Sequence, residues 1–66
     1  MLTEQRYEKI LDLVNEKKSV TVKEMTELLE SSESTIRRDL TVLHKKGRLV
    51  KVFGGAVAIE DRKSVV

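Results

Sequence analysis

The chain contains no cysteine, no tryptophan and a single histidine among its 66 residues. Without cysteine, neither a disulfide framework nor a thiolate metal site is possible. Tyr7 and Phe53 are the only aromatic residues, so the core must rest on aliphatic packing. A chain of this length forms one small domain, and it buries only about 60% of the surface that its unfolded form exposes.

Long apolar runs are missing as well. No basic segment followed by an apolar segment occurs near Met1, so no secretory signal is visible. No stretch approaches the length that a membrane span requires. We therefore expect a cytoplasmic protein with no membrane partner.

The residues that enzymes use are scarce. The carboxylate pairs Glu4 with Glu8 and Glu24 with Glu27 have the spacing of an exposed helix surface. The pair of glycines at 54–55 lacks the lysine and the following helix of a phosphate-binding loop. No cluster of metal ligands is present. The sequence therefore predicts a protein that is not an enzyme and that has neither a cofactor nor a metal site.

Charge is unevenly distributed along the chain, although the net charge is only +2. Residues 1–30 carry a net charge of −2, residues 31–53 carry +4, and the remainder is neutral. A basic segment of this kind is typical of proteins that bind a polyanion. The same clustering also occurs by chance on solvated protein surfaces.

Apolar periodicity predicts three helices. The first spans about residues 3–16, with Thr3 as its N-cap. The second begins at Thr21, because Thr21 and Glu24 have the spacing of a capping box, and it ends near residue 29. Ser32 caps the third, which spans about residues 33–46 and ends at Gly47 in a left-handed conformation. The expected buried faces are Tyr7, Ile10, Leu11 and Val14; Val22, Met25, Leu28 and Leu29; and Ile36, Leu40 and Leu43.

Two β-prone segments follow the third helix, at residues 48–53 and 56–59. Gly54 and Gly55 separate them, and we expect both glycines to supply the positive φ of a tight hairpin turn. Residues 19–21 include the β-branched Val20 and Thr21 and can form a short strand that pairs with a later segment. The predicted fold is therefore mainly α, a three-helix winged helix-turn-helix with a small β-hairpin wing.

The predicted domain spans residues 3–59. Its helix-turn-helix occupies about residues 21–46 and its wing about residues 48–59. The charged and then apolar segment at residues 60–66 contains no turn or cap signal. We interpret this segment as the start of a linker to an effector domain that lies outside the chain.

The outward face of the third helix has the chemistry of a DNA-reading surface. On a helical projection Arg38 points directly away from the core, and Arg37 lies on the flank. Arginine reads guanine in the major groove through two parallel hydrogen bonds, so we assign base reading to Arg38 and a phosphate to Arg37. Lys51 is placed to reach phosphates from the hairpin, although a lysine there also protects an exposed strand edge. The predicted DNA-binding residues are Thr21, Ser34, Thr35, Arg37, Arg38, Thr41, Lys45 and Lys51.

Two further residues lie at the edge of the third helix's buried face. Asp39 is an acid in a basic helix, and we hypothesise that it pairs with Arg6 of the first helix. A contact with Thr35 and neutralisation of Arg38 are the alternatives. His44 near the helix C-terminus is expected to be a boundary residue that interacts with the helix dipole, not a ligand.

These residues together resemble a known family. The segment Thr35-Ile36-Arg37-Arg38-Asp39-Leu40, with Arg6 and Ile10 before it, is similar to the signature of the DeoR (deoxyribose operon repressor) family of bacterial transcription regulators. The resemblance continues through Lys46-Gly47 and Gly54-Gly55-Ala56-Val57, and it covers about residues 3–59. Ser31 departs from it, because the family usually has an apolar residue before the cap.

The resemblance implies a winged helix that binds double-stranded DNA with its third helix in the major groove. It also implies a full-length repressor of a sugar or nucleoside catabolic operon, which forms homo-oligomers and senses a phosphorylated sugar through another domain. The isolated domain is expected to be a monomer that binds DNA weakly, since it lacks a second half-site.

A winged helix used for protein–protein contact is the main alternative. It predicts an exposed apolar patch on the third helix or on the hairpin. RNA binding is a weaker alternative, because the stacking aromatic residues that it needs are missing.

Overall fold

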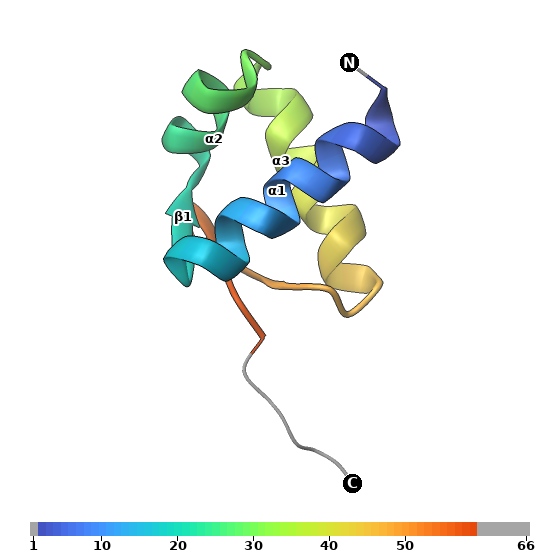
Figure 1. Cartoon of the computed structure of the whole chain (residues 1–66), viewed down its shortest axis with the longest axis vertical. Helices are drawn as coiled ribbons and strands as arrows, with labels where there is room; N and C mark the ends of the chain where they lie inside the picture. Colours follow the sequence, from blue (N-terminus) through green and yellow to red (C-terminus); the bar gives the residue numbers. More distant parts are fainter. Residues whose placement is uncertain (1, 60–66) are drawn as a thin grey trace, which may run out of the picture.

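The computed structural model describes residues 2–59, which form three helices and a small antiparallel sheet (Figure 1). The elements are α1 (Thr3–Lys17), β1 (Ser19–Thr21), α2 (Val22–Leu29), α3 (Glu33–Lys45), β2 (Val50–Val52) and β3 (Gly55–Val57). This order confirms the predicted winged helix-turn-helix. The predicted linker at 60–66 lies outside the described residues.

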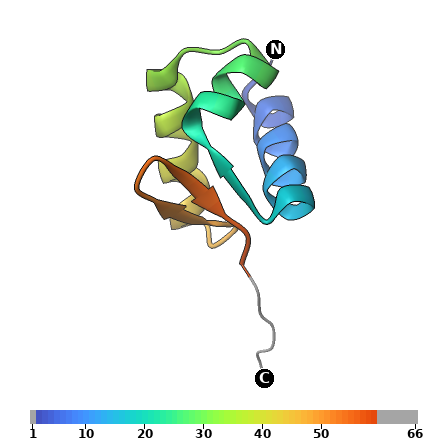
Figure 2. The same cartoon turned by 90° about the vertical axis from the view of Figure 1, so that its left-hand side faces the viewer.

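The sheet has the strand order β1-β3-β2, with both pairs antiparallel. Strands β2 and β3 form the hairpin wing, and β1 joins its other edge, with Val20 opposite Ala56. Figure 2 shows β1 leading from the end of α1 into α2 beside this hairpin. The short segment between the first two helices therefore ties the wing to the helical part of the domain, as its β-branched residues predicted.

The core lies between the three helices and the sheet. Ile10, Met25, Ile36 and Leu40 are completely buried, and Leu49 and Ala56 extend the core under the wing. Tyr7 and Leu11 are half-buried against this cluster. Aliphatic side chains thus form nearly all of the buried apolar surface, as the scarcity of aromatic residues required.

Leu28 was predicted to be buried but is 55% exposed. α2 has only eight residues, and Val22, Met25 and Leu29 already cover the side that contacts the core. Leu28 lies instead at the edge of a shallow hollow between α1 and α2, where Leu13 and Leu29 also line the surface.

The helix starts differ in how well the sequence predicted them. α1 begins at Thr3 itself, so the cap position is Leu2, which makes no side-chain cap hydrogen bond, and the predicted Thr3 cap is wrong. α2 has the predicted capping box, in which the Glu24 amide donates to the Thr21 hydroxyl over 3.1 Å and the Glu24 carboxylate accepts from the Thr21 amide. Ser32 caps α3 as predicted.

The two glycines of the hairpin have different roles, which corrects the predicted turn. Gly54 has a φ of 80° and forms the turn together with Phe53, whereas Gly55 is a strand residue with no positive φ. A Cβ atom on Gly55 would lie 2.9 Å from the Thr21 Cα and would also clash with the Val20 carbonyl oxygen. Glycine is needed at position 55 because the backbone of the neighbouring strand β1 lies too close for a side chain, not because of turn geometry.

Candidate nucleic-acid interface

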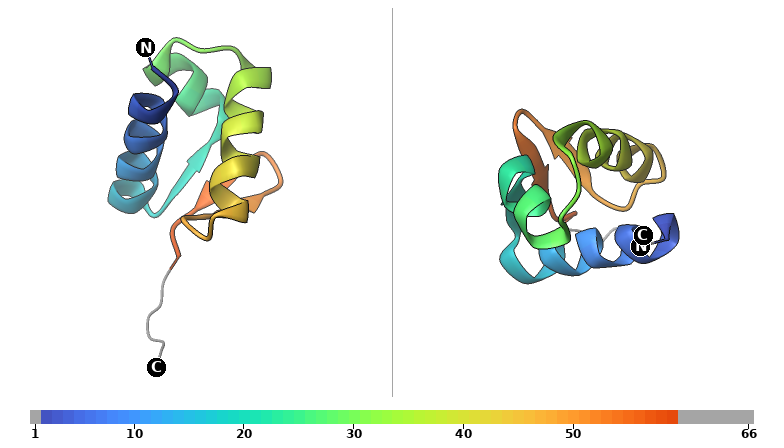
Figure 3. Two further views of the ribbon diagram at one scale, coloured as in Figure 1. Left: turned by 90° about the vertical axis from the view of Figure 1, so that its right-hand side faces the viewer. Right: turned by 90° about the horizontal axis from the view of Figure 1, so that it is seen from above.

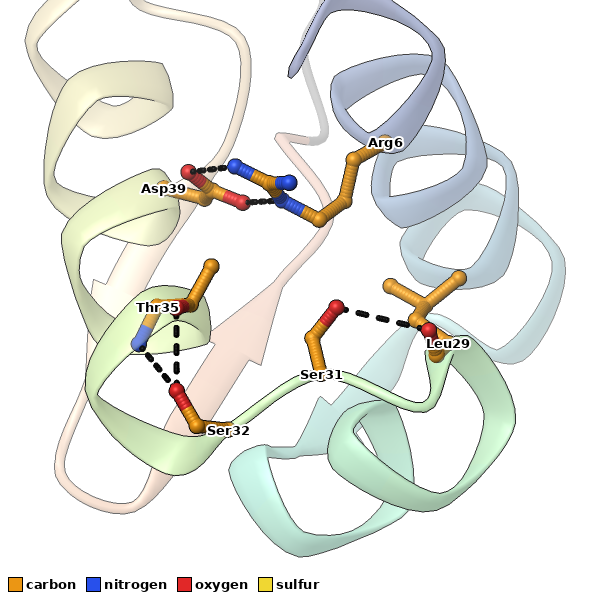
Figure 4. Close-up of polar contacts among 6 residues, drawn as sticks. All are labelled: Arg6, Leu29, Ser31, Ser32, Thr35 and Asp39. Atoms are coloured by element: carbon orange, nitrogen blue, oxygen red, sulfur yellow. Dashed lines mark hydrogen bonds and ion pairs between the residues drawn. The ribbon is translucent and has the colours of Figure 1, made fainter. Parts of the chain in front are cut away.

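The turn between α2 and α3 sets the direction in which α3 leaves the core. Glu30 adopts the left-handed conformation with a φ of 53°, and its amide donates to the Thr26 carbonyl. The Ser31 amide donates to the same carbonyl over 3.2 Å, and the Ser31 hydroxyl donates to the Leu29 carbonyl over 3.3 Å. Ser31, the departure from the family pattern, therefore satisfies the end of α2 with polar contacts (Figure 4).

At the start of α3 the Ser32 hydroxyl has two partners. It accepts from the Thr35 amide over 3.3 Å and lies 2.9 Å from the Thr35 hydroxyl oxygen. This arrangement satisfies one of the free amides of the first turn and fixes the Thr35 side chain. The hydroxyl groups thus lie at the positive end of the helix, where its dipole attracts an anion such as phosphate.

An ion pair locks α3 to α1. The Arg6 guanidinium binds the Asp39 carboxylate in a two-point contact, in which Nε donates to one oxygen and Nη2 donates to the other over 3.1 Å (Figure 4). The side chains are 15% and 4% exposed, so the pair is largely shielded from water. The hydrogen bonds that Arg6 donates to Asp39 raise the pKa of Arg6 above its ordinary value; burial lowers this pKa, and the negative charge of Asp39 adds to the rise. The hypothesised Arg6–Asp39 pair is confirmed.

The outward face of α3 is polar and basic. Ser34, Arg37, Arg38, Thr41 and Lys45 are exposed, and Val42 at the margin is half-buried. Ile36, Leu40 and Leu43 are buried on the opposite side, so the helical projection placed both faces correctly. None of the ion pairs between residues 2 and 59 involves Arg38 or Lys45.

Several of the predicted DNA-binding side chains have contacts within the chain. Arg37 lies 3.8 Å from the Glu33 carboxylate in an exposed ion pair, and the Thr41 hydroxyl donates to the Arg37 carbonyl over 3.0 Å. An exposed pair one helical turn apart contributes only about 0.3–0.5 kcal/mol. It leaves Arg37 available to a phosphate at little cost. The i,i+4 spacing of Glu33 and Arg37 is the sequence signal from which this pair could have been predicted.

The wing lies beside α3 and is fixed to it by a contact that sequence reasoning missed. The amide of Lys51 on β2 donates to Nδ1 of His44 on α3 over 3.2 Å. His44 is therefore a hydrogen-bond acceptor for the wing, which is more specific than the predicted boundary role. No local pattern could have shown it, because the geometry depends on how the hairpin returns to the helix.

The wing and α3 face the same side of the molecule. Figure 3 shows the hairpin turn and α3 both on the side away from α1. Lys51 is exposed on β2, and Thr21 lies at the opposite edge of the sheet, paired with Gly55. The structure thus brings α3 and the wing to the same side of the molecule, while the Thr21 hydroxyl is engaged in the capping box of α2.

Within residues 2–59 no group of three or more acidic or histidine side chains is placed to bind a metal ion. None of the helices in this part of the chain has the length and apolar character that a membrane crossing needs.

Comparison with known proteins agrees with the fold. The model of the DeoR-like helix-turn-helix domain matches residues 6–62. The chain belongs to the DeoR-like helix-turn-helix family. No solved structure gives a significant match.

Similar full-length proteins are regulators of bacterial transcription. The HTH-type transcriptional regulator YulB of Bacillus subtilis is 39% identical over 66 residues, which are 100% of this chain and 26% of that protein. The lactose phosphotransferase system repressor of Streptococcus mutans is 43% identical over 56 residues, 85% of this chain and 22% of that protein. A putative galactitol utilization operon repressor of Escherichia coli is 42% identical over 60 residues, 91% of this chain and 54% of that protein.

The DeoR-like chain spans about a quarter of the length of the first two relatives and about half of the third. The similarity therefore concerns the helix-turn-helix part of a transcriptional regulator. The names of these relatives describe regulators and repressors, not enzymes.

Proposed function

We propose that this domain binds duplex DNA with α3 in the major groove and the wing on the flanking phosphate backbone. The observation that carries the proposal is the outward face of α3, where two arginines and a lysine stand among small hydroxyl side chains. This face has no large aliphatic side chain to favour a protein partner. Arg38, which points away from the core and has no ion-pair partner among residues 2–59, is the proposed base-reading residue.

The remaining contacts are to phosphates. Ser34 and Thr35 lie near the N-terminus of α3, where free amides and the dipole favour a phosphate. Arg37, Thr41 and Lys45 flank Arg38 along the helix, and Lys51 and Thr21 lie on the sheet beside it. Phosphate contacts position the helix, and base contacts give it sequence preference.

In a full-length protein the domain would regulate an operon for sugar or nucleoside catabolism, acting as a repressor in the bacterial cytoplasm. The similar repressors of lactose and galactitol systems support this assignment. Two copies in a homo-oligomer would read a repeated or palindromic site, and a further domain would sense a phosphorylated sugar. A single copy would bind more weakly, because linking two binding modules makes the second binding event intramolecular.

Fluorescence anisotropy on a short labelled duplex tests the proposal. The wild-type domain should bind at low salt, and its affinity should fall steeply as salt rises. Arg38→Ala should weaken binding by roughly 1–3 kcal/mol on a preferred site. Glu8→Ala, which removes an exposed side chain on α1, is the control and should not weaken it. Absence of binding at low salt by a folded domain would overturn the proposal.

One observation favours a second candidate function. The hairpin exposes Phe53 completely, and Val50 and Val52 are 38% and 40% exposed. Such a patch is what a winged helix used for protein–protein contact would show. If the folded domain fails to bind duplex DNA, this hairpin surface becomes the leading candidate for a partner site.

A further inference from the structure

Phe53 stands fully exposed at the tip of the wing, with a relative exposure of 107%. Single apolar side chains on a surface are common, but this one is next to the exposed Val52 on a hairpin of only two three-residue strands. The chain has only two aromatic residues, and Tyr7 is packed against the core. The chain therefore places its only free aromatic ring at the point farthest out on the hairpin.

The tip that carries Phe53 is held in a defined position. The Gly54 carbonyl accepts from the Val22 amide over 2.9 Å, which fixes the turn to the start of α2. The strand before the turn is fixed to α3 by the bond from the Lys51 amide to His44. The positive φ of Gly54, in open space, closes the turn directly after Phe53. Because the backbone on both sides of Phe53 is fixed, binding costs conformational entropy mainly in the Phe53 side chain and not in the hairpin.

The surroundings of the ring indicate what it contacts. The hairpin turn lies on the same side of the molecule as α3 (Figure 3), the helix that exposes Arg37, Arg38 and Lys45. Lys51 is exposed on β2, the strand that leads directly into Phe53. No acidic residue lies between positions 40 and 59. An apolar tip beside Lys51 and on the same side as the basic face of α3 suits a polyanion that offers an apolar surface between its charges.

We propose that Phe53 enters the minor groove adjacent to the segment of major groove that α3 occupies. There the ring packs on deoxyribose and partly unstacks a base step, while the neighbouring lysine contacts the bordering phosphates. Apolar wedges of this kind kink the duplex at flexible pyrimidine–purine steps. The wing thereby adds a preference for a deformable step beside the site without a hydrogen bond to a base. This inference rests on the proposed duplex-binding function.

Phe53→Ala and Lys51→Ala separate an apolar wedge from an electrostatic contact. Phe53→Ala should lower the affinity for a duplex that contains a central TA step on the order of tenfold. It should leave the salt dependence unchanged, because no charge is removed. In a plot of the logarithm of the affinity against the logarithm of the salt concentration, Lys51→Ala should reduce the steepness of the slope by about one. Both variants should remain folded, since both side chains are exposed.

Phe53→Trp gives a direct readout, because the chain contains no other tryptophan. Titration with the TA duplex should quench its fluorescence and protect it from acrylamide. Leu2→Trp, at an exposed position before α1, is the matched control and should stay accessible to acrylamide when DNA is bound.

The outcomes distinguish the two proposals. If the wild-type domain binds no duplex, the duplex-binding function itself fails. If it binds but Phe53→Ala binds equally well, the wedge is overturned and the duplex-binding function stands, which leaves the ring to a protein partner. Loss of affinity without protection of the Phe53→Trp fluorescence would also overturn the wedge.

Discussion

Arg6 on α1 and Asp39 on α3 form a two-point ion pair that links the two helices. Asp39 is the one buried charged residue among residues 2–59, with a relative exposure of 3%. It lies one position after Arg38, which points away from the core. The pair therefore fixes the rotation of α3 about its own axis, which decides which side chains face outward.

Removing Arg6 should destabilise the domain strongly, because it leaves the Asp39 carboxylate buried without a partner. We expect Arg6→Ala to lower the free energy of unfolding by about 3 kcal/mol, the lower end of the cost of breaking a buried pair. Thermal unfolding followed by circular dichroism measures the effect. Arg37→Ala removes the exposed pair with Glu33 and is the control, with an expected cost below about 1 kcal/mol. Unchanged stability in Arg6→Ala would contradict a structural role for the pair.

The close approach of the β1 backbone to Gly55 makes this position less tolerant of a side chain than Gly54. A Cβ at position 55 meets the backbone of Val20 and Thr21, so Gly55→Ala should force β1 away from the wing and cost about 1–3 kcal/mol or more. Gly54→Ala meets open space and carries only the strain of its positive φ, about 1–2 kcal/mol. Urea unfolding of the two variants makes the comparison. A larger loss for Gly54→Ala would mean that turn geometry dominates.

The Ser32 hydroxyl, which caps α3, should contribute more to the stability of the domain than an exposed hydroxyl within that helix. Ser32→Ala removes the acceptor of the Thr35 amide and should cost about 1 kcal/mol of stability. Ser34→Ala, two residues later on the exposed face, should change stability by less than about 0.5 kcal/mol. Denaturant titration resolves the difference, and equal effects would argue against the cap.

The hydrogen bond between His44 and the wing predicts a local effect without a global one. In His44→Ala the Lys51 amide loses its acceptor, so its hydrogen exchange should become faster. Exchange of the core amide of Leu40 should be unchanged. NMR-detected exchange measures both amides in one sample. Unaltered protection at Lys51 would show that the β-sheet alone holds the wing.

Sequence patterns predicted the features that depend on local periodicity. The spans of the helices, the Thr21–Glu24 capping box, the Ser32 cap and the Gly47 stop all follow from residues within one or two turns of each other. Gly47 has the predicted left-handed conformation, with a φ of 75°. The Arg6–Asp39 pair was within reach because both residues lie at the edges of apolar faces that must meet.

The features that the sequence did not reveal depend on how the elements meet. Leu28 has the spacing of a buried face, but α2 is only eight residues long and contacts the core through Val22, Met25 and Leu29. The core does not extend over Leu28. The close approach at Gly55 requires knowing that β1 pairs with β3, and the His44 contact requires the return path of the hairpin. The roles in DNA binding assigned to Thr21, Ser34, Thr35, Arg37, Arg38, Thr41, Lys45 and Lys51 stay predictions.

If α3 and the wing form the DNA-binding surface, their amides should respond when duplex DNA binds. A titration of the ¹⁵N-labelled domain with a short duplex at low salt, followed by amide chemical shifts, measures this response. We expect large shifts at residues 32–45 and 51–54, and small shifts at residues 9–13 of α1. Shifts concentrated on α1 and α2, with α3 unaffected, would contradict it.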